Sequence, residues 1–219
     1  MTWPNGVIPY VISASYSSRE RGIIGQAMAE ITAKTCLRFI PRTSSHRDYI
    51  HIYRGKGVVI HELMHAVGFW HEQSRPDRDT YVTINWANIL QAQSYNFQKV
   101  SNTMSTDLGL AYDYDSVMHY GAYDFARDRS RPTITPRRSG VTIGQRRGLS
   151  QLDARGLNLL YRCPSTGPIT TTTTNRPTPT TCNDYNSFCS SWAFAGYCSY
   201  NPGYMNIYCQ KSCDLCGEF

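Results

Sequence analysis

The segment His61-Glu62-Leu63-Met64-His65 holds two histidines four residues apart, with a glutamate directly after the first. On a helix, residues at this spacing lie one turn above each other on the same face, so both imidazoles can bind one ion. A glutamate at this place is typical of a carboxylate that takes a proton from a metal-activated water. Gly68 can adopt the positive φ that ends a helix, after which the chain can turn and bring His71 to the same ion. Three protein ligands leave one position open for water, the arrangement of a catalytic zinc.

A less specific explanation of this pattern is a pair of surface histidines with a glutamate in a salt bridge. The extended pattern disfavours it, because five positions are specified over eleven residues and the apolar residues Val59, Leu63 and Val67 recur at helical spacing. We therefore predict that zinc is bound by His61, His65 and His71 and that Glu62 is the general base. Since three ligands are already assigned, His46 and His51 are predicted to be surface or strand residues.

The flanking sequence predicts the elements that position this site. Residues 7–12, 37–40 and 48–53 have strand patterns, and Pro9 favours an edge or end position for the first strand. Ser17 and Glu20 have capping-box spacing, and apolar residues then follow at helical intervals toward Lys34. The remaining predictions are a zinc helix from about Val58, a short strand at 82–84, a helix within 86–97 and a helix starting at Ser150. Strands with interspersed helices, before a less regular half, predict an α+β domain.

Composition and charge narrow the class of protein. The 219 residues allow one domain and a small module, and the apolar fraction of 41% suits a packed core. No apolar run reaches the length of a membrane span, we find no nucleic-acid-binding motif, and no signal peptide is visible. Eight cysteines nevertheless favour an oxidising compartment, so we predict a secreted, extracellular protein. The net charge of +6 lies mainly in residues 1–163, where it either biases a cleft toward acidic substrates or keeps the surface solvated.

Two further segments follow the predicted domain at residues 1–163. Residues 164–181 are rich in threonine and proline and offer few side chains to bury, which predicts an extended, O-glycosylated linker. Residues 182–216 contain six cysteines, so disulfides must supply much of the stability of so small a module. Six cysteines allow fifteen pairings, and the spacing does not choose among them. A redox role for Cys213 and Cys216 is disfavoured, because four other cysteines lie close by.

The histidine pattern is the metzincin signature. Its continuation from His71 to Asp79, and the segment Ser116-Val117-Met118-His119-Tyr120, resemble the astacin family of zinc metalloproteases. In that family the second segment forms a turn named after its methionine, the Met-turn. The resemblance covers residues 3–163 and implies an α+β catalytic domain with a twisted sheet and an active-site helix.

The resemblance also implies roles for residues outside the histidine pattern. Tyr120 becomes a further zinc ligand that swings away to hydrogen-bond the reacting carbonyl oxygen, and its phenol is a plausible donor there. Met118 forms an apolar floor beneath the histidines. Cys36 and Cys163 match one of the two disulfides of the family, with two free buried thiols as the alternative. The implied reaction is peptide hydrolysis by metal-activated water, with Glu62 moving the proton to the leaving amine.

The cysteine spacing of the last module resembles the ShK toxin-like (ShKT) domain. That resemblance implies the disulfides Cys182–Cys216, Cys189–Cys209 and Cys198–Cys213. Relatives that block potassium channels have a lysine where this chain has Gly203, so a channel-blocking role is disfavoured.

One departure from the astacin pattern lies between Tyr53 and Val58. Astacins carry a long stretch there, with their second disulfide and the edge strand that pairs with substrate, whereas here four residues, 54–57, join the two positions. We interpret this as an in-frame excision, from a skipped exon or a wrong gene model, that weakens the positioning of extended peptides.

The predicted function is that of a zinc-dependent endopeptidase. Its predicted partners are protein or peptide substrates, such as those of extracellular matrix or cuticle. The alternative is a catalytically impaired zinc-binding or matrix-interaction protein, which the missing segment favours and the complete ligand set disfavours.

Overall fold

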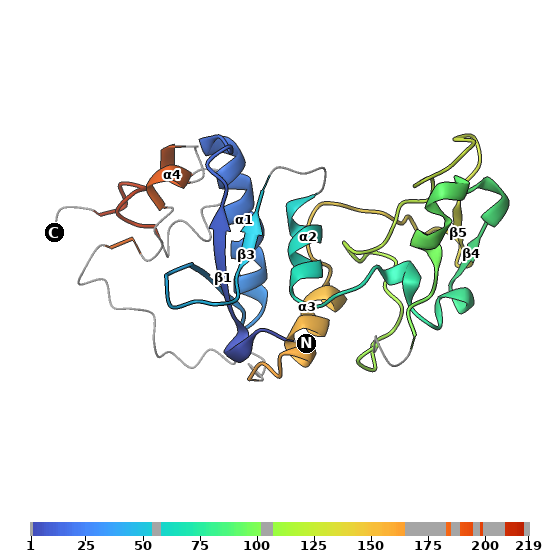
Figure 1. Ribbon diagram of the computed structural model, residues 1–219, viewed down its shortest axis with the longest axis horizontal. Helices are drawn as coiled ribbons and strands as arrows, with labels where there is room; N and C mark the ends of the chain where they lie inside the picture. The colour runs from blue at the N-terminus through green and yellow to red at the C-terminus, as the bar shows by residue number, and fades with distance from the viewer. Residues whose placement is uncertain are drawn as a thin grey trace. The chain divides into compact units, whose positions relative to one another are not determined.

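The structure is a computed structural model that describes residues 2–53, 58–101, 107–164, 183–184, 189–194, 198 and 209–216 (Figure 1). Its first sheet has the strand order β2-β1-β3, with β1 at Val7–Ile12, β2 at Arg38–Pro41 and β3 at Ile50–Ile52. β1 and β2 run parallel, in a register that pairs Val7 with Arg38. Parallel neighbours need a crossover connection, and the helix α1, Ser18–Lys34, supplies it.

The prediction for α1 is confirmed at its first turn. Ser17 N–H donates to the Glu20 carboxylate at 2.8 Å, and Glu20 N–H donates to Ser17 Oγ at 3.3 Å. These reciprocal bonds form the predicted capping box. The edge position predicted for β1 is wrong, because β1 lies between two strands. β3 has three residues against the six of β1, and Pro9, which has no N–H to donate, lies in register with Ile40 of β2.

Two further helices flank the candidate site. Helix α2 spans Val59–Ala66 and buries Ile60, His61, Leu63 and Met64, as the apolar spacing predicts. Helix α3 spans Gln151–Leu160 and begins with a capping box between Ser150 and Asp153. A disulfide joins Cys36 to Cys163, the pair implied by the astacin resemblance.

The segment between α2 and α3 is mostly irregular, with a two-stranded antiparallel sheet of β4, Val82–Ile84, and β5, Ile134–Pro136. Short 3-10 helices lie at Glu72–Ser74, Arg78–Thr80, Trp86–Asn88 and Gln91–Phe97. A buried cluster supports this part of the chain and consists of Val82, Ile84, Ile89, Phe97, Tyr112, Tyr120, Ile134 and Ile143.

The single helix predicted within residues 86–97 is found as two 3-10 helices with a break between them. Ile89 has an extended backbone and forms a β-bridge with Ala126. The next residue, Leu90, donates its N–H to the Phe125 carbonyl at 3.0 Å. Because these long-range contacts take the backbone groups that a helix needs, the segment divides into two 3-10 helices.

The C-terminal module has a short helix, α4, at Cys189–Phe194. Disulfides join Cys189 to Cys209 and Cys198 to Cys213, as the ShKT resemblance implies. Cys216 is also disulfide-bonded, but its expected partner Cys182 lies outside the described residues. Most of the expected linker, residues 165–181, and Gly203 also lie outside them. Within the described part of the chain, no helix has the length and apolar character to cross a bilayer.

Candidate metal centre

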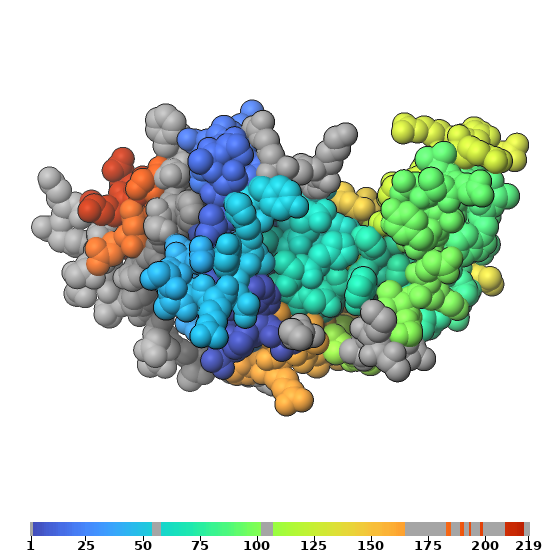
Figure 2. All heavy atoms as spheres, in the orientation of Figure 1, coloured from blue at the N-terminus to red at the C-terminus, as the bar shows by residue number. Residues whose placement is uncertain are grey.

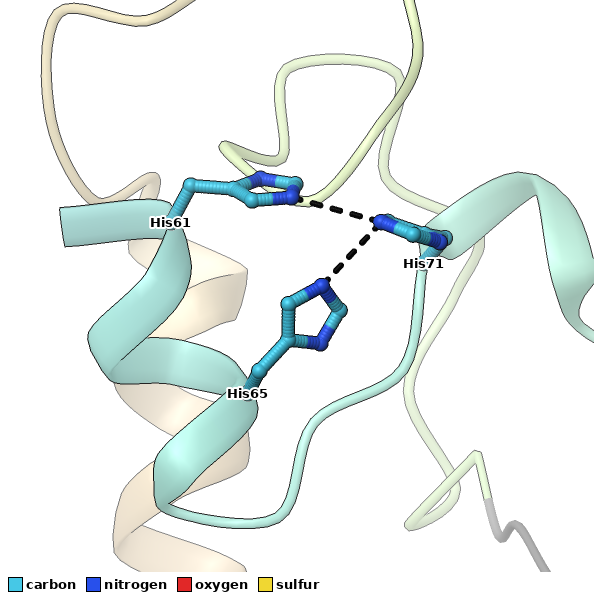
Figure 3. Close-up of side chains that lie close together, drawn as sticks. All are labelled: His61, His65 and His71. Atoms are coloured by element: carbon cyan, nitrogen blue, oxygen red, sulfur yellow. Dashed lines mark hydrogen bonds between the residues drawn. The ribbon is translucent and has the colours of Figure 1, made fainter. Parts of the chain in front are cut away.

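Three imidazole rings converge where α2 and the following turn meet (Figure 3). His61 and His65 lie one helical turn apart on α2, and His71 approaches them from beyond the turn. The Nε2 atom of His71 lies 3.3 Å from Nε2 of His61 and 3.1 Å from Nε2 of His65. The structure therefore brings together the three predicted ligands. His46 and His51 are not members of this cluster.

The turn after α2 brings His71 to the other two histidines. Gly68 has φ 106°, a conformation that glycine adopts readily. Its N–H donates to the His65 carbonyl, and the next N–H, of Phe69, donates to the Met64 carbonyl, both at 3.0 Å. This pair of bonds is a Schellman motif, which ends the helix and reverses the chain. The position of His71 thus follows from the conformation of Gly68.

Backbone carbonyls orient two of the three rings. Nδ1 of His61 lies 2.8 Å from the Val117 carbonyl, and Nδ1 of His65 lies 2.8 Å from the Phe69 carbonyl. Because a carbonyl oxygen only accepts, each Nδ1 carries the hydrogen, and the neutral form of each ring presents a lone pair at Nε2. Such a bond to the outer nitrogen is typical of histidines that bind metals.

The spacing of the three Nε2 atoms fits zinc. Lone pairs that face one another repel, and a single N–H on His71 could satisfy only one of its two neighbours. A tetrahedral zinc with Zn–N bonds of about 2.0–2.1 Å holds its ligand nitrogens about 3.3–3.4 Å apart. The separations of 3.3 and 3.1 Å agree with that value to within about 0.3 Å.

The surroundings favour the unprotonated form of two of the three imidazoles. Burial, followed by the neighbouring His65 and His61, lowers the pKa of His71 to about 3. Burial likewise lowers the pKa of His61 below its usual value. Metal ligands must be neutral imidazoles, so the protein favours the protonation state that binds a cation.

The structure places Glu62, Tyr120 and Met118, the other residues to which the resemblance gives a role, as follows. Glu62 is exposed on α2, and its charge acts on both His61 and Tyr120. The ring of Tyr120 lies 4.5 Å from the ring of His71, centroid to centroid. Met118 is buried, and its carbonyl accepts the N–H of Glu72, the residue after His71. Of these three residues, Tyr120 is the one whose side chain contacts a ring of the imidazole cluster.

A buried carboxylate that the sequence analysis did not identify as part of the site supports the Met-turn. Asp153, at the start of α3, accepts hydrogen bonds from Ser116 Oγ at 2.7 Å and from Val117 N–H at 2.9 Å. The Val117 carbonyl in turn accepts the bond from His61. In the sequence, Asp153 stands three residues after Ser150, at the spacing of a capping box. Its bonds to Ser116 and Val117 join residues more than 35 positions apart, so no local pattern indicates them.

Glu72 lies beside a cavity of about 280 Å³ whose lining includes His71, Arg75 and Met118. Its carboxylate accepts the Asp113 N–H at 2.8 Å and pairs with Arg75 at 3.2 Å. Burial nevertheless raises the pKa of Glu72 to about 7, against the opposing effects of these two partners. A carboxyl group whose pKa burial raises to about 7 thus lies directly after His71 in the chain and in the wall of this cavity.

Comparison with known proteins identifies the family. A family model described as Astacin, a peptidase family, matches residues 1–57 and 53–162. The chain belongs to the astacin family. Its C-terminal residues 181–216 match a model described as ShK domain-like. The two astacin matches meet at residues 53–57, where the sequence indicates a missing segment, and a divided match agrees with that interruption.

Similar proteins include zinc metalloproteinase nas-15 of Caenorhabditis elegans, which is 38% identical over 98% of this astacin chain. Tolloid-like protein 2 of Mus musculus is 41% identical over 85% of the chain and 21% of its own length. High choriolytic enzyme 1, a hatching enzyme zinc-protease from Oryzias latipes (medaka fish), is 40% identical. Its structure superposes with a TM-score of 0.69 over 75% of this chain and 94% of its own.

The chain spans about half the length of the nematode relatives it matches. It covers 47% of nas-15, 42% of nas-13 and 58% of nas-14, all three of them zinc metalloproteinases of Caenorhabditis elegans. The similarity to the medaka enzyme confirms the predicted α+β, astacin-like fold.

Proposed function

We propose that this protein is a zinc-dependent endopeptidase that hydrolyses peptide bonds of protein substrates. The observation that supports it most is the position of His71 Nε2, which lies 3.3 Å from Nε2 of His61 and 3.1 Å from Nε2 of His65. The exposed carboxylate of Glu62 lies on the helix that carries the last two histidines. Zinc bound there supplies a Lewis acid that lowers the pKa of water and polarises the scissile carbonyl. The proposed ligands are His61, His65 and His71, with Tyr120 as a further, exchangeable ligand.

Glu62 is the proposed general base. Its exposed position leaves the carboxylate accessible to a water and a peptide, and its place next to His61 keeps it beside the metal ligands. It accepts the proton of the attacking water and then delivers it to the nitrogen of the leaving amine, so the enzyme regains its starting state. The reaction has no covalent enzyme intermediate.

Tyr120 is the proposed hydrogen-bond donor to the carbonyl oxygen as charge develops on it. Burial raises the pKa of Tyr120 to about 12, so the phenol keeps its proton at neutral pH. A donor that is already held in place stabilises the transition state more than water does. Met118 is proposed to support the ligands from below.

The domain limits and the cell compartment are part of the same proposal. We propose an astacin domain at 1–163, a linker at 164–181 and a ShKT module at 182–216. Secretion is supported by the disulfides of both folded parts, since such bonds persist in oxidising compartments. Extracellular matrix or cuticle proteins are the proposed substrates.

The deciding experiment uses Glu62→Gln in the full chain. The variant is expected to bind one zinc per chain, because its histidines are intact, yet to cleave an unfolded test protein about 10²–10⁴-fold more slowly. The matched control is Asp48→Asn, the same carboxylate-to-amide change at an exposed position, which should leave cleavage unchanged. Undiminished proteolysis by Glu62→Gln rules out its role.

The alternative is a zinc-binding protein with impaired catalysis, which the short connection of residues 54–57 between Tyr53 and Val58 suggests. The wild-type chain separates the two functions. Zinc binding together with cleavage that Glu62→Gln abolishes supports the peptidase, whereas zinc binding with no cleavage by either chain supports the alternative.

A further inference from the structure

Residues 127–138 carry an unusual concentration of one charge. The segment contains five arginines and a single aspartate, a net charge of +4 out of +6 for the whole chain. It follows the Met-turn, continues through β5 and contains no lysine and no aromatic residue. We call Arg127, Arg129, Arg131, Arg137 and Arg138 the arginine strip.

The five side chains are at the surface and are largely without acidic partners. All five residues are exposed, and the yellow-green and yellow atoms of this part of the chain stand at the surface in Figure 2. Arg131 pairs with Asp128 at 3.4 Å. Among the described residues, the other four arginines form no ion pair within 4.0 Å. Their mutual repulsion is therefore left for an external anion to neutralise.

The loop that carries the first three arginines is held firmly by a buried side chain. Asn88 donates to the carbonyls of Asp128 and Arg131 at 3.0 and 2.7 Å and accepts the Asp128 N–H at 3.0 Å. Its own carbonyl accepts the Arg127 N–H at 2.8 Å. Asn88 is 7% exposed, so these bonds are shielded from water. A loop ordered in advance loses less entropy when it binds a partner.

The strip is too long for one small anion. The chain is extended over the three residues of β5, Ile134–Pro136, with Arg131 before this strand and Arg137 and Arg138 after it. The strip therefore offers several guanidinium contacts on both sides of a strand, and one small anion accepts hydrogen bonds from only a few of them. An extended polyanion can engage both ends, whereas a free sulfate or phosphate cannot.

Residue type indicates the chemistry of that polyanion. Guanidinium groups bind oxyanions through two parallel hydrogen bonds, which favours sulfate and phosphate groups. Stacking platforms for nucleobases are aromatic, and the segment has none. The Cys36–Cys163 disulfide of the same domain indicates an oxidising compartment, where nucleic acid is not the usual polyanion.

We infer that the arginine strip is a docking surface for a sulfated polysaccharide of the extracellular space. This inference does not depend on the proposed peptidase activity, because no residue of the strip is a member of the imidazole cluster. A polyanion bound at the strip would neutralise most of the excess positive charge of the chain.

The test compares two variants of the full chain with equal net charge. The first replaces Arg127, Arg129, Arg137 and Arg138 by Gln, and the control replaces the exposed Arg19, Arg38, Arg47 and Arg155 by Gln. Each set lowers the net charge by four. Binding to a heparin oligosaccharide is measured by calorimetry at several salt concentrations, with circular dichroism to verify that each variant is folded.

The strip variant is expected to bind heparin about tenfold or more weakly than the wild type, with a shallower dependence on salt. The control variant should stay within about threefold of the wild type, because its charges lie outside the strip. Equal losses in both variants overturn the inference, since net charge alone then explains the binding. Equal or tighter binding to unsulfated hyaluronan, an oligonucleotide or phosphatidylserine vesicles also overturns it.

Discussion

The carboxylate of Asp153 accepts the backbone N–H of Val117 at 2.9 Å, and the carbonyl of the same Val117 accepts Nδ1 of His61 at 2.8 Å. One peptide segment therefore links the first turn of α3 to His61, a proposed metal ligand on α2. The proposed metal centre thus relies on the Asp153 carboxylate, which is itself neither a proposed ligand nor the proposed general base.

Replacing Asp153 by Ala is expected to weaken both folding and metal binding. The change leaves Ser116 Oγ and the N–H groups of Val117 and Ser150 without their acceptor, which should lower the free energy of unfolding by about 3–5 kcal/mol. Zinc affinity should fall about tenfold as the Val117 carbonyl loses its position. Urea unfolding and zinc titration measure the two effects. Asp115→Ala, at a side chain that is 64% exposed, should change the free energy of unfolding by less than about 0.5 kcal/mol.

A Gly68→Ala variant tests whether the Schellman turn places the third ligand. A side chain at φ 106° is strained, so the variant should lose about 1 kcal/mol or more of stability and bind zinc less tightly as His71 shifts. Gly140→Ala is the matched control, because Gly140 has φ 75° with no atom within 4 Å of an added Cβ. It should share the backbone strain and keep the zinc affinity. Equal zinc affinity in both variants contradicts the role given to the turn.

Removal of the metal or of one ligand should lower thermal stability. Zinc at 100 times its dissociation constant stabilises a protein by about 2.7 kcal/mol, so a chelator should reduce the melting temperature of the wild type. His65→Ala should bind zinc weakly and show little further change with chelator. His51→Ala, which removes an imidazole outside the cluster, should respond as the wild type does. The measurements are metal content and calorimetric melting with and without chelator.

Alkaline pH should destabilise the protein partly through Tyr10. Burial raises the pKa of Tyr10 to about 12, whereas an unfolded tyrosine titrates near its usual value of about 10. The unfolded state thus releases this proton first, so the contribution of Tyr10 is complete below about pH 10 and is lost as the pH rises toward about 12. The loss amounts to about 2–3 kcal/mol.

Tyr10→Phe has no such proton to release. The free energy of unfolding of the wild type should therefore fall relative to that of Tyr10→Phe between pH 10 and 12, as measured by urea unfolding at each pH. Tyr123→Phe, at a side chain that is 55% exposed, should run parallel to the wild type. Parallel curves for Tyr10→Phe and the wild type contradict the expected shift.

Local patterns allowed the sequence to predict much of the fold. The capping bonds of Ser17 with Glu20 and of Ser150 with Asp153 join residues three apart, and the turn at Gly68 follows directly from the helix that it ends. Such features depend on neighbouring residues alone, so residue type and spacing are enough to find them.

The features that the sequence analysis missed depend on contacts between distant residues. β5 pairs with β4 about 50 positions earlier, and the Ile89–Ala126 bridge interrupts a segment whose own pattern favours a helix. The bond from Asp153 to Val117 spans 36 positions. The periodicity of apolar residues does not indicate which distant residues will pair. Where such contacts form, they override the local secondary-structure propensity of the segment.

The backbone contacts of His61 and His65 have one more consequence. Both rings are oriented by main-chain oxygens, of Val117 and Phe69, which no amino-acid replacement at those two positions deletes. The orientation of these ligands is therefore encoded in the path of the chain rather than in the identity of the two residues. Side chains at these two positions can therefore be replaced while both imidazoles keep the orientation that the proposed metal site requires.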